Sequence, residues 1–374
     1  MDKGMIDNRQ FTENVYYRGR VALYAILNAI GVNKGDKVAL QSFTCVAVPE
    51  AVLAIGANPL YIDIKPKGFN MDAVDLYQKL TSDVRAIVVQ HTYGIPADMD
   101  RIMDIANSRS IPVIEDCCHT FMSKYKGQTV GSFGIGSFYS FEWGKPLVAG
   151  VGGSAVVNDD KNSDNIVKSY TEYKLPSFTK QARIEIQYRI FKILYRPSLF
   201  WPVRTLFHNL SALGLAEGNY NPVGEDNLAE DFNLKMAPFV KKRLLKKKRD
   251  FETCIQHSRW VAKQYRDRIQ SNEIAHPLLL PDTDVVFARY PLVVKNKLEF
   301  LADARKNNVE LAEWYATPIH PLKEKELALV HYETGSCPNA EQRCREVVTL
   351  PTHQTVMQRD IERTVNFLNK IINK

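Results

Sequence analysis

Short apolar segments alternate with amphipathic segments along the first 160 residues of the chain. The apolar runs are typical of buried strands, because they are short, rich in Val and Ile, and bounded by turn-forming residues. The segments between them repeat apolar residues at helical spacing. The pattern predicts strands over 37–40, 59–64, 83–90, 111–116 and 136–141, and helices over 21–30, 48–56 and 98–109. Strands that alternate with helices build a largely parallel sheet, so we expect an α/β fold.

The sequence changes in character between residues 165 and 225, where aromatic, proline and basic residues become frequent. A basic helix is predicted next, over 236–254 and onward through 257–269. The C-terminal part predicts a smaller α/β unit, with strands over 287–294 and 345–351 and helices over 297–308 and 359–374. We therefore expect a large domain over 1–245, which carries the basic aromatic insertion at 165–225, and a small domain over 246–374.

Composition is that of an ordinary globular protein, since 45% of the 374 residues are hydrophobic and 24% are charged. No apolar run reaches the ~20 residues that a membrane-spanning helix needs, and the polar N-terminal stretch does not resemble a secretion signal. The six cysteines form no C-x-x-C pair. They favour reduced thiols in the cytoplasm, and no metal site is expected.

Two residues near the middle of the predicted sheet carry the candidate chemistry. Asp116 ends the strand 111–116, so its carboxylate is expected at the sheet edge where ligands of α/β folds gather. A buried carboxylate there needs a cationic or hydrogen-bonding partner, and a protonated pyridine nitrogen would be one. Asp116 alone also fits a helix cap. Lys145 follows in the next loop, between Ser140 and the glycine-rich residues 150–153. Such flanks can shield an amine from water, which makes it nucleophilic toward an aldehyde.

These residues stand in segments that resemble the DegT-like sugar-nucleotide aminotransferases, which are fold-type I enzymes dependent on pyridoxal 5′-phosphate (PLP). Most of the chain takes part in the resemblance. The family's order and spacing are followed by residues 35–64, 90–106, 111–119, 126–141, 152–159 and 337–356. The resemblance implies a fold-type I PLP transferase with a large, mostly parallel-sheet domain and a smaller C-terminal α/β domain.

The resemblance also implies roles for individual residues. Lys145 would be the Schiff-base lysine, Asp116 the partner of the pyridinium nitrogen, and Ser140 a ligand of the cofactor phosphate. Gly19 and Arg20 stand at the family's Gly-Thr, at the start of the first helix. Free N–H groups there would bind the phosphate, and Arg20 would add an ionic contact.

Four further positions complete the expected site. Cys45 stands where the family has an aromatic residue that stacks on the cofactor, and His119 stands where it has a glutamine. His320 ends the segment WYATPIH and matches a substrate-binding histidine. Asn233 matches an asparagine that reaches the phosphate of the neighbouring subunit, which implies a homodimer with shared active sites. A helix N-cap is the alternative role for Asn233.

The function implied by the resemblance is transfer of an amino group from L-glutamate to a keto sugar linked to a nucleotide, for surface polysaccharide synthesis. Two alternatives remain open at this point. One is a PLP-dependent dehydratase of keto-deoxy sugars, although that class carries histidine where this chain has Lys145. The other is a non-catalytic regulator or scaffold, which the unusual Cys45 and His119 motivate.

Residues 181–215 mix basic side chains with aromatic and aliphatic ones. The basic residues are Arg183, Arg189, Lys192, Arg196 and Arg204. Such a mixture suits a membrane interface, so one hypothesis is contact with the inner face of an anionic bilayer or with a lipid-linked sugar. The hypothesis that we favour is an insertion that packs its apolar side on the sheet or on the dimer partner. The chain contains no recognisable nucleic-acid module, so no such partner is expected.

Overall fold

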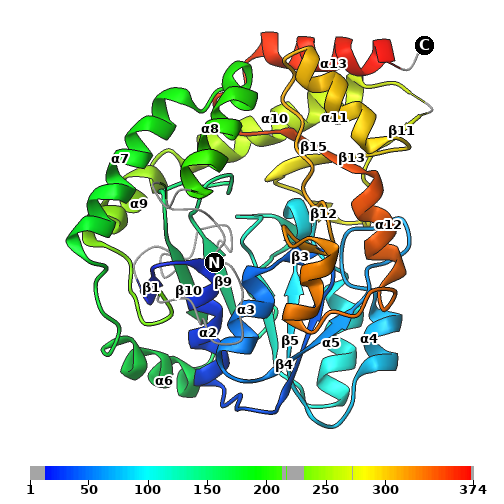
Figure 1. Cartoon of the computed structure of the whole chain (residues 1–374). Coiled ribbons are helices and arrows are strands. Elements are labelled where there is room, and N and C mark those ends of the chain that lie inside the picture. The colour runs from blue at the N-terminus through cyan, green and yellow to red at the C-terminus, as the bar shows by residue number, and fades with distance from the viewer. Residues whose placement is uncertain (1–12, 213–215, 217–230, 272, 372–374) are drawn as a thin grey trace.

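The computed structural model describes residues 13–212, 216, 231–271 and 273–371. Its centre is a seven-stranded sheet in the order β1-β10-β9-β6-β5-β2-β4 (Figure 1). These strands are β1 (Val15–Tyr16), β2 (Lys37–Gln41), β4 (Asn58–Ile62), β5 (Val84–Gln90), β6 (Val113–Asp116), β9 (Gly136–Ser140) and β10 (Gly153–Val157). The strands from β9 to β4 are parallel, whereas β10 runs antiparallel to both of its neighbours, β9 and β1. The expected α/β fold with a largely parallel sheet is confirmed.

Helices cover both faces of this sheet. One face carries α2 (Gly19–Ala29), α3 (Ala47–Ala54) and α6 (Asp160–Tyr170), and the other carries α4 (Ala73–Lys79) and α5 (Met99–Ser108). Val38 and Leu40 pack in the cluster with α2 and α3, while Ala39 packs in the cluster with α4 and α5. Because side chains alternate along a strand, a strand buried on both faces is apolar throughout. This double burial explains the continuous apolar runs of the sequence.

The basic helix predicted over 236–269 is interrupted. The structure has α9 (Pro238–Lys248) and α10 (Phe251–Arg268), which are separated at Arg249 and Asp250. The chain turns there so that Phe251 becomes buried together with Leu244 of α9. The expected domain boundary near residue 245 falls at the end of α9 and stays a prediction.

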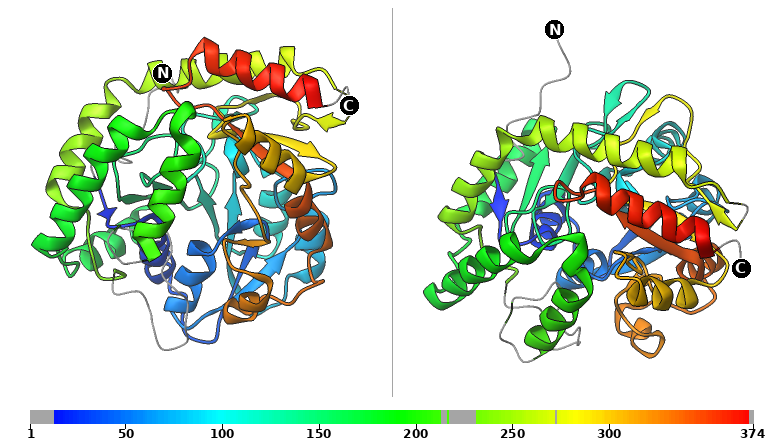
Figure 2. Two further views of the ribbon diagram at one scale, coloured as in Figure 1. Left: turned by 45° about the horizontal axis from the view of Figure 1, so that its top comes forward. Right: turned by 90° about the horizontal axis from the view of Figure 1, so that it is seen from above.

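The C-terminal part forms a smaller unit around the sheet β11-β13-β15. Its elements are β11 (Ile274–Ala275), β13 (Arg289–Val294), α11 (Lys297–Lys306), α12 (Pro338–Glu346), β15 (Val347–Pro351) and α13 (Gln358–Ile371). The strand predicted over 345–351 begins at Val347 instead, because Arg345 and Glu346 belong to the end of α12. Helix α10 packs against α13, and the two lie side by side in Figure 2. Short pieces complete the described fold: β3 (Thr44–Cys45), β7 (Lys124–Tyr125), β8 (Gln128–Thr129), β12 (Thr283–Asp284), β14 (Ile319–His320), and the 3₁₀ turns Thr92–Gly94, Pro197–Leu199 and Glu324–Val330.

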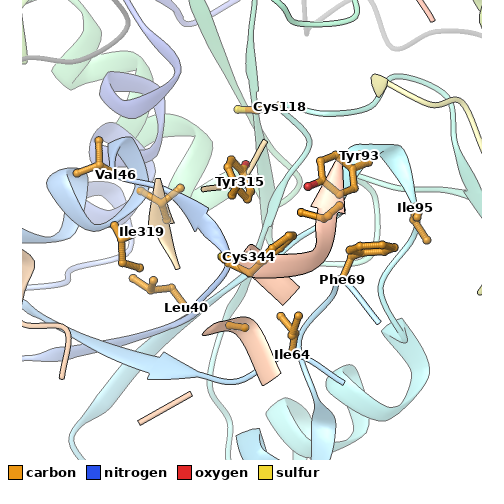
Figure 3. Packing of buried hydrophobic residues seen from close by; sticks show 14 of the residues in the cluster. Leu40, Val46, Ile64, Phe69, Tyr93, Ile95, Cys118, Tyr315, Ile319 and Cys344 are labelled. Carbon is orange, nitrogen blue, oxygen red and sulfur yellow. The ribbon is translucent and has the colours of Figure 1, made fainter. Parts of the chain in front are cut away.

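One hydrophobic cluster joins the two parts. Figure 3 shows Tyr315 and Cys344 of the C-terminal part among buried residues of the first part such as Leu40. A polar contact adds to this packing, because the Asp63 carboxylate accepts hydrogen bonds from the backbone N–H groups of Asn339 and Ala340, both at 2.9 Å. Asp63 therefore caps the start of α12 from a position far away in the sequence.

The described part of the insertion includes the end of α6 and the helices α7 (Phe178–Leu194) and α8 (Phe200–Ala212); α7 and α8 lie along one side of the molecule (green in Figure 1). Residues 213–215 of the basic aromatic segment, and 217–225 of the insertion, lie outside the described residues. In α7 only Ile184 is buried. Among the helices that the structure describes, none has the length and apolar character needed to cross a bilayer.

Candidate active site

Asp116 ends β6 and is 4% exposed. One of its carboxylate oxygens accepts a hydrogen bond from Cys118 N at 2.9 Å. Burial raises the pKa of Asp116, while the Cys118 amide and the Lys145 ammonium oppose this shift. A buried carboxylate gains from a cation within hydrogen-bonding distance. A protonated pyridine nitrogen has the right charge and donor for this position.

Glu115, one residue earlier, points to the other face of the sheet. Its buried carboxylate accepts three backbone N–H bonds of 2.6 to 2.9 Å from the loop 131–134. The fourth donor is His91 Nε2, at 3.1 Å, which carries the proton because His91 Nδ1 accepts a backbone N–H. Glu115 therefore fixes the loop that leads into β9, and with it the position of Ser140 at the end of that strand.

Lys145 lies in the loop between β9 and β10, and its ammonium stands 5.1 Å from the centre of the Trp314 ring. The loop is closed at its base, where Phe141 N donates to Gly152 O at 2.8 Å. Lys145 and Trp314 line the same cavity as Asp116. The two residues predicted to carry the chemistry are thus brought together.

Glycines allow α2 to start directly beside Ser140. A Cβ added at Gly19 would lie 3.1 Å from the Ser140 Cβ, and one added at Gly153 would lie 2.4 Å from the Arg18 carbonyl oxygen. No side chain of the described residues caps the start of α2. Its N–H groups and the Ser140 hydroxyl therefore form a cradle at the cavity wall, suited to an anionic group such as a phosphate.

Two buried arginines flank this cradle and are held by carboxylates. Arg20 donates to Glu50 at 2.8 Å and to Asp231 at 2.9 Å, and Arg18 donates to Asp231 at 2.8 Å and to Glu142 at 2.9 Å. Burial raises the pKa of Glu50 to about 7 despite Arg20. The pKa of Asp231 is lowered, since Arg20 and Arg18 together outweigh the effect of burial. Arg20 thus lines the cavity, but its guanidinium is engaged by acids, with only Nε lacking a partner in the described chain.

His119 and Cys45 both line the cavity. His119 Nδ1 accepts the Tyr93 N–H at 3.2 Å, and its Nε2 lies 3.3 Å from the Tyr315 hydroxyl. Burial lowers the pKa of His119 far below its usual value, so the ring is neutral and its proton sits on Nε2. The Trp314 ring lies 4.9 Å from the His119 ring. Burial raises the pKa of Cys45 to about 11, which keeps the thiol protonated.

Asn233 and His320 lie outside this cavity. The Asn233 side chain is exposed, and the backbone carbonyl of Asn233 accepts the Lys174 N–H at 2.9 Å. His320 pairs with Cys45 through β14 and β3, but it lines a neighbouring groove. Burial lowers the pKa of His320 to about 3, so this ring is also neutral.

Sequence reasoning missed several residues of the cavity. Trp314, Tyr315, Arg18 and Glu142 line it, yet none was expected there. The only signal was the segment WYATPIH, which contains Trp314 and Tyr315 and ends at the predicted His320.

Comparison with protein-family models identifies the family to which the sequence is similar. The model of the DegT/DnrJ/EryC1/StrS aminotransferase family matches residues 17–369.

Individual relatives match less uniformly. The GDP-perosamine synthase of Escherichia coli O157:H7 is 42% identical over 141 residues, which are 38% of this chain and 39% of the relative. The chain thus spans about two fifths of the length of that relative. The dTDP-3-amino-3,6-dideoxy-alpha-D-galactopyranose transaminase of Aneurinibacillus thermoaerophilus is 27% identical over 94% of this chain and 83% of its own. The crystal structure of S. venezuelae DesV has a TM-score of 0.76, with 20% identity over 96% of this chain and 85% of that chain, and so shares the fold.

Proposed function

This chain belongs to the DegT/DnrJ/EryC1/StrS aminotransferase family, and we propose that it is a PLP-dependent sugar aminotransferase. The proposed reaction moves an amino group from L-glutamate to a keto sugar that is linked to a nucleotide. The observation that carries the proposal is one cavity that holds the Lys145 amine, the buried Asp116 carboxylate and the Gly19–Ser140 cradle.

The residues present fit the cofactor. The cradle at Gly19 and Ser140 would hold its phosphate, because N–H groups and a hydroxyl meet where a side chain on Gly19 would crowd Ser140. Asp116 would hold its ring nitrogen, and Lys145 would bond to its aldehyde. When bound, the cofactor supplies an electron sink for the carbanion that forms at the amino donor.

The chain's own residues divide the remaining work. Asp116 keeps the ring nitrogen protonated, because a buried carboxylate stabilises a positive charge beside it. The Lys145 amine, once released, moves a proton to and from the α-carbon of the donor. Trp314 and the neutral His119 stand beside this amine and limit the access of water. Because His119 is neutral, it adds no positive charge beside Lys145.

We further propose a cytoplasmic homodimer with shared active sites, which acts in surface polysaccharide synthesis. The exposed Asn233 side chain lies outside its own cavity. It is therefore available to complete the cradle of a second subunit, as the family resemblance implies.

The test is the absorption of the purified protein loaded with PLP. Wild-type protein should absorb at about 400–430 nm and lose this band when L-glutamate is added. Lys145→Ala should lack both the band and turnover, whereas the exposed Lys246→Ala should behave as wild type. Turnover by Lys145→Ala would refute the assignment. A protein that stays colourless with PLP would favour a scaffold, and a coloured protein that glutamate does not bleach would point to another donor or to dehydration.

A further inference from the structure

Helices α7 and α8 leave much of their apolar surface uncovered. Ile186 is 60% exposed, Ile190 is 50% exposed and Leu206 is 49% exposed. Large exposed apolar surfaces are unusual in folded proteins and mark binding sites. The proposed reaction makes no use of these side chains.

These side chains line a hollow. Between α7, α8 and the edge of the active site lies a groove of about 1030 Å³, here called the α7–α8 groove. Its apolar lining includes Ile186, Ile190, Phe191, Leu194, Phe207 and Trp314. Its volume matches the upper end of the roughly 300–1,000 Å³ of small-molecule sites.

A buried donor in the groove wall also points to a ligand. Trp143 lines the groove, is 8% exposed, and packs 4.8 Å from the Phe191 ring. Its indole Nε1 is buried and has no hydrogen-bond partner among the described residues. Buried tryptophan N–H groups nearly always find an acceptor, so this one is suited to an oxygen of a bound molecule.

The groove adjoins the active site. Trp143 and Gly144 line it and directly precede Lys145, and Trp314 lines both the groove and the catalytic cavity. A molecule in the groove would therefore lie next to the loop that carries the reactive amine.

Arginines stand along the same groove. Arg204 pairs with Glu313, and Arg289 pairs with Glu310 at 2.9 Å. Arg196 also lines the groove and forms no ion pair with any residue that the structure describes. Arg204 and Arg289 are thus neutralised by their acids, whereas Arg196 adds to the apolar lining a positive charge suited to a phosphate.

We propose that the α7–α8 groove binds the hydrocarbon chain of a lipid phosphate, with the phosphate at Arg196. A nucleotide would leave the apolar lining unused. A bilayer surface would meet outward side chains such as Ile193, which is 65% exposed and does not line the groove. A sugar carried on this phosphate would reach Lys145 as the amino acceptor, and this part of the proposal rests on the proposed function. The binding of the hydrocarbon chain does not rest on it.

The test uses farnesyl phosphate as the probe, followed by calorimetry and by tryptophan fluorescence, since Trp143 and Trp314 line the groove. Wild-type protein should bind it saturably. Ile190→Glu should weaken binding at least about tenfold, because it places a charge in the apolar lining. The matched control Ile193→Glu, on the same helix but outside the groove, should bind as wild type. Arg196→Gln should weaken binding of farnesyl phosphate several-fold and leave farnesol unaffected.

Other outcomes would overturn the proposal. Equal binding by wild type and Ile190→Glu would exclude the groove. Loss of anionic-vesicle binding in Ile193→Glu, without saturable farnesyl phosphate binding, would indicate a bilayer contact instead. A change of oligomeric state in Ile190→Glu by light scattering, again without probe binding, would indicate a second copy of the chain. Lys145→Ala should bind farnesyl phosphate as wild type does. A failure of the aminotransferase assignment can therefore be distinguished from a failure of the groove to bind the probe.

Discussion

Replacing Glu115 with alanine should destabilise the protein severely although the residue contacts neither cofactor nor substrate. Glu115 is fully buried and is the acceptor for three backbone N–H groups of the loop 131–134 and for His91 Nε2. Alanine removes this acceptor and supplies none. Each buried donor left without a partner costs about 1–3 kcal/mol.

Four such donors give a loss of roughly 4 kcal/mol at the lower end of that range. The free energy of unfolding of a typical protein is only about 5–15 kcal/mol, so Glu115→Ala should be close to the limit of folding. Glu115→Gln should lose less stability than Glu115→Ala, because the amide oxygen still accepts hydrogen bonds. It should still be less stable than wild type, because the amide NH₂ faces backbone donors. The order of stability is expected to be wild type, then Gln, then Ala.

The assay is urea unfolding followed by circular dichroism, with Glu252→Ala as the control. Glu252 is an exposed carboxylate on α10 whose replacement should change the free energy of unfolding by no more than about 0.5 kcal/mol. A loss below about 1 kcal/mol in Glu115→Ala would refute the reasoning, since it would mean that the loop finds other acceptors without cost.

Three further outcomes are expected. Asp116→Asn should keep the fold and lower kcat by roughly a hundredfold or more, because the amide cannot hold a positive ring nitrogen; wild-type kcat would contradict the role. Gly153→Ala should cost about 3 kcal/mol or more and weaken PLP binding, since its Cβ would lie 2.4 Å from backbone at the start of α2, whereas Ser154→Ala should be tolerated; both are read by urea unfolding and PLP titration. Lys297 donates to three backbone carbonyls, and burial lowers its pKa from 10.5 to about 8. Between pH 8 and 10.5 the unfolded chain therefore binds a proton that the folded chain does not, so the contribution of Lys297 to stability should rise with pH by up to roughly 3 kcal/mol. Lys297→Met should lack this rise when the two pH profiles of unfolding are compared.

Local patterns predicted the sheet and its helices well because burial on both faces leaves a strong signal in each strand. The position of Asp116 at a strand end followed from the same signal. Trp314 could not be placed in this way. It reaches the cavity through the packing of the C-terminal unit on the first part of the chain, which no local pattern encodes.

Arg20 illustrates a second limit of prediction. Its place at the start of α2 followed from the sequence, but its partners Glu50 and Asp231 are fixed only by the folded chain. A cation near a phosphate cradle was a reasonable expectation for a phosphate contact. The carboxylates that hold the guanidinium come from distant segments and could not be read in advance.

The contact between Asp63 and the start of α12 has a consequence for the order of folding during synthesis. The residues that it joins are separated by 276 positions. All strands of the large sheet would therefore have been synthesised before α12 left the ribosome, with Leu40 and other core residues still uncovered. Such distant contacts slow folding and expose apolar surface on the way. This chain should therefore depend on chaperones while it is being made, and truncation before α12 should yield aggregates rather than a smaller folded protein.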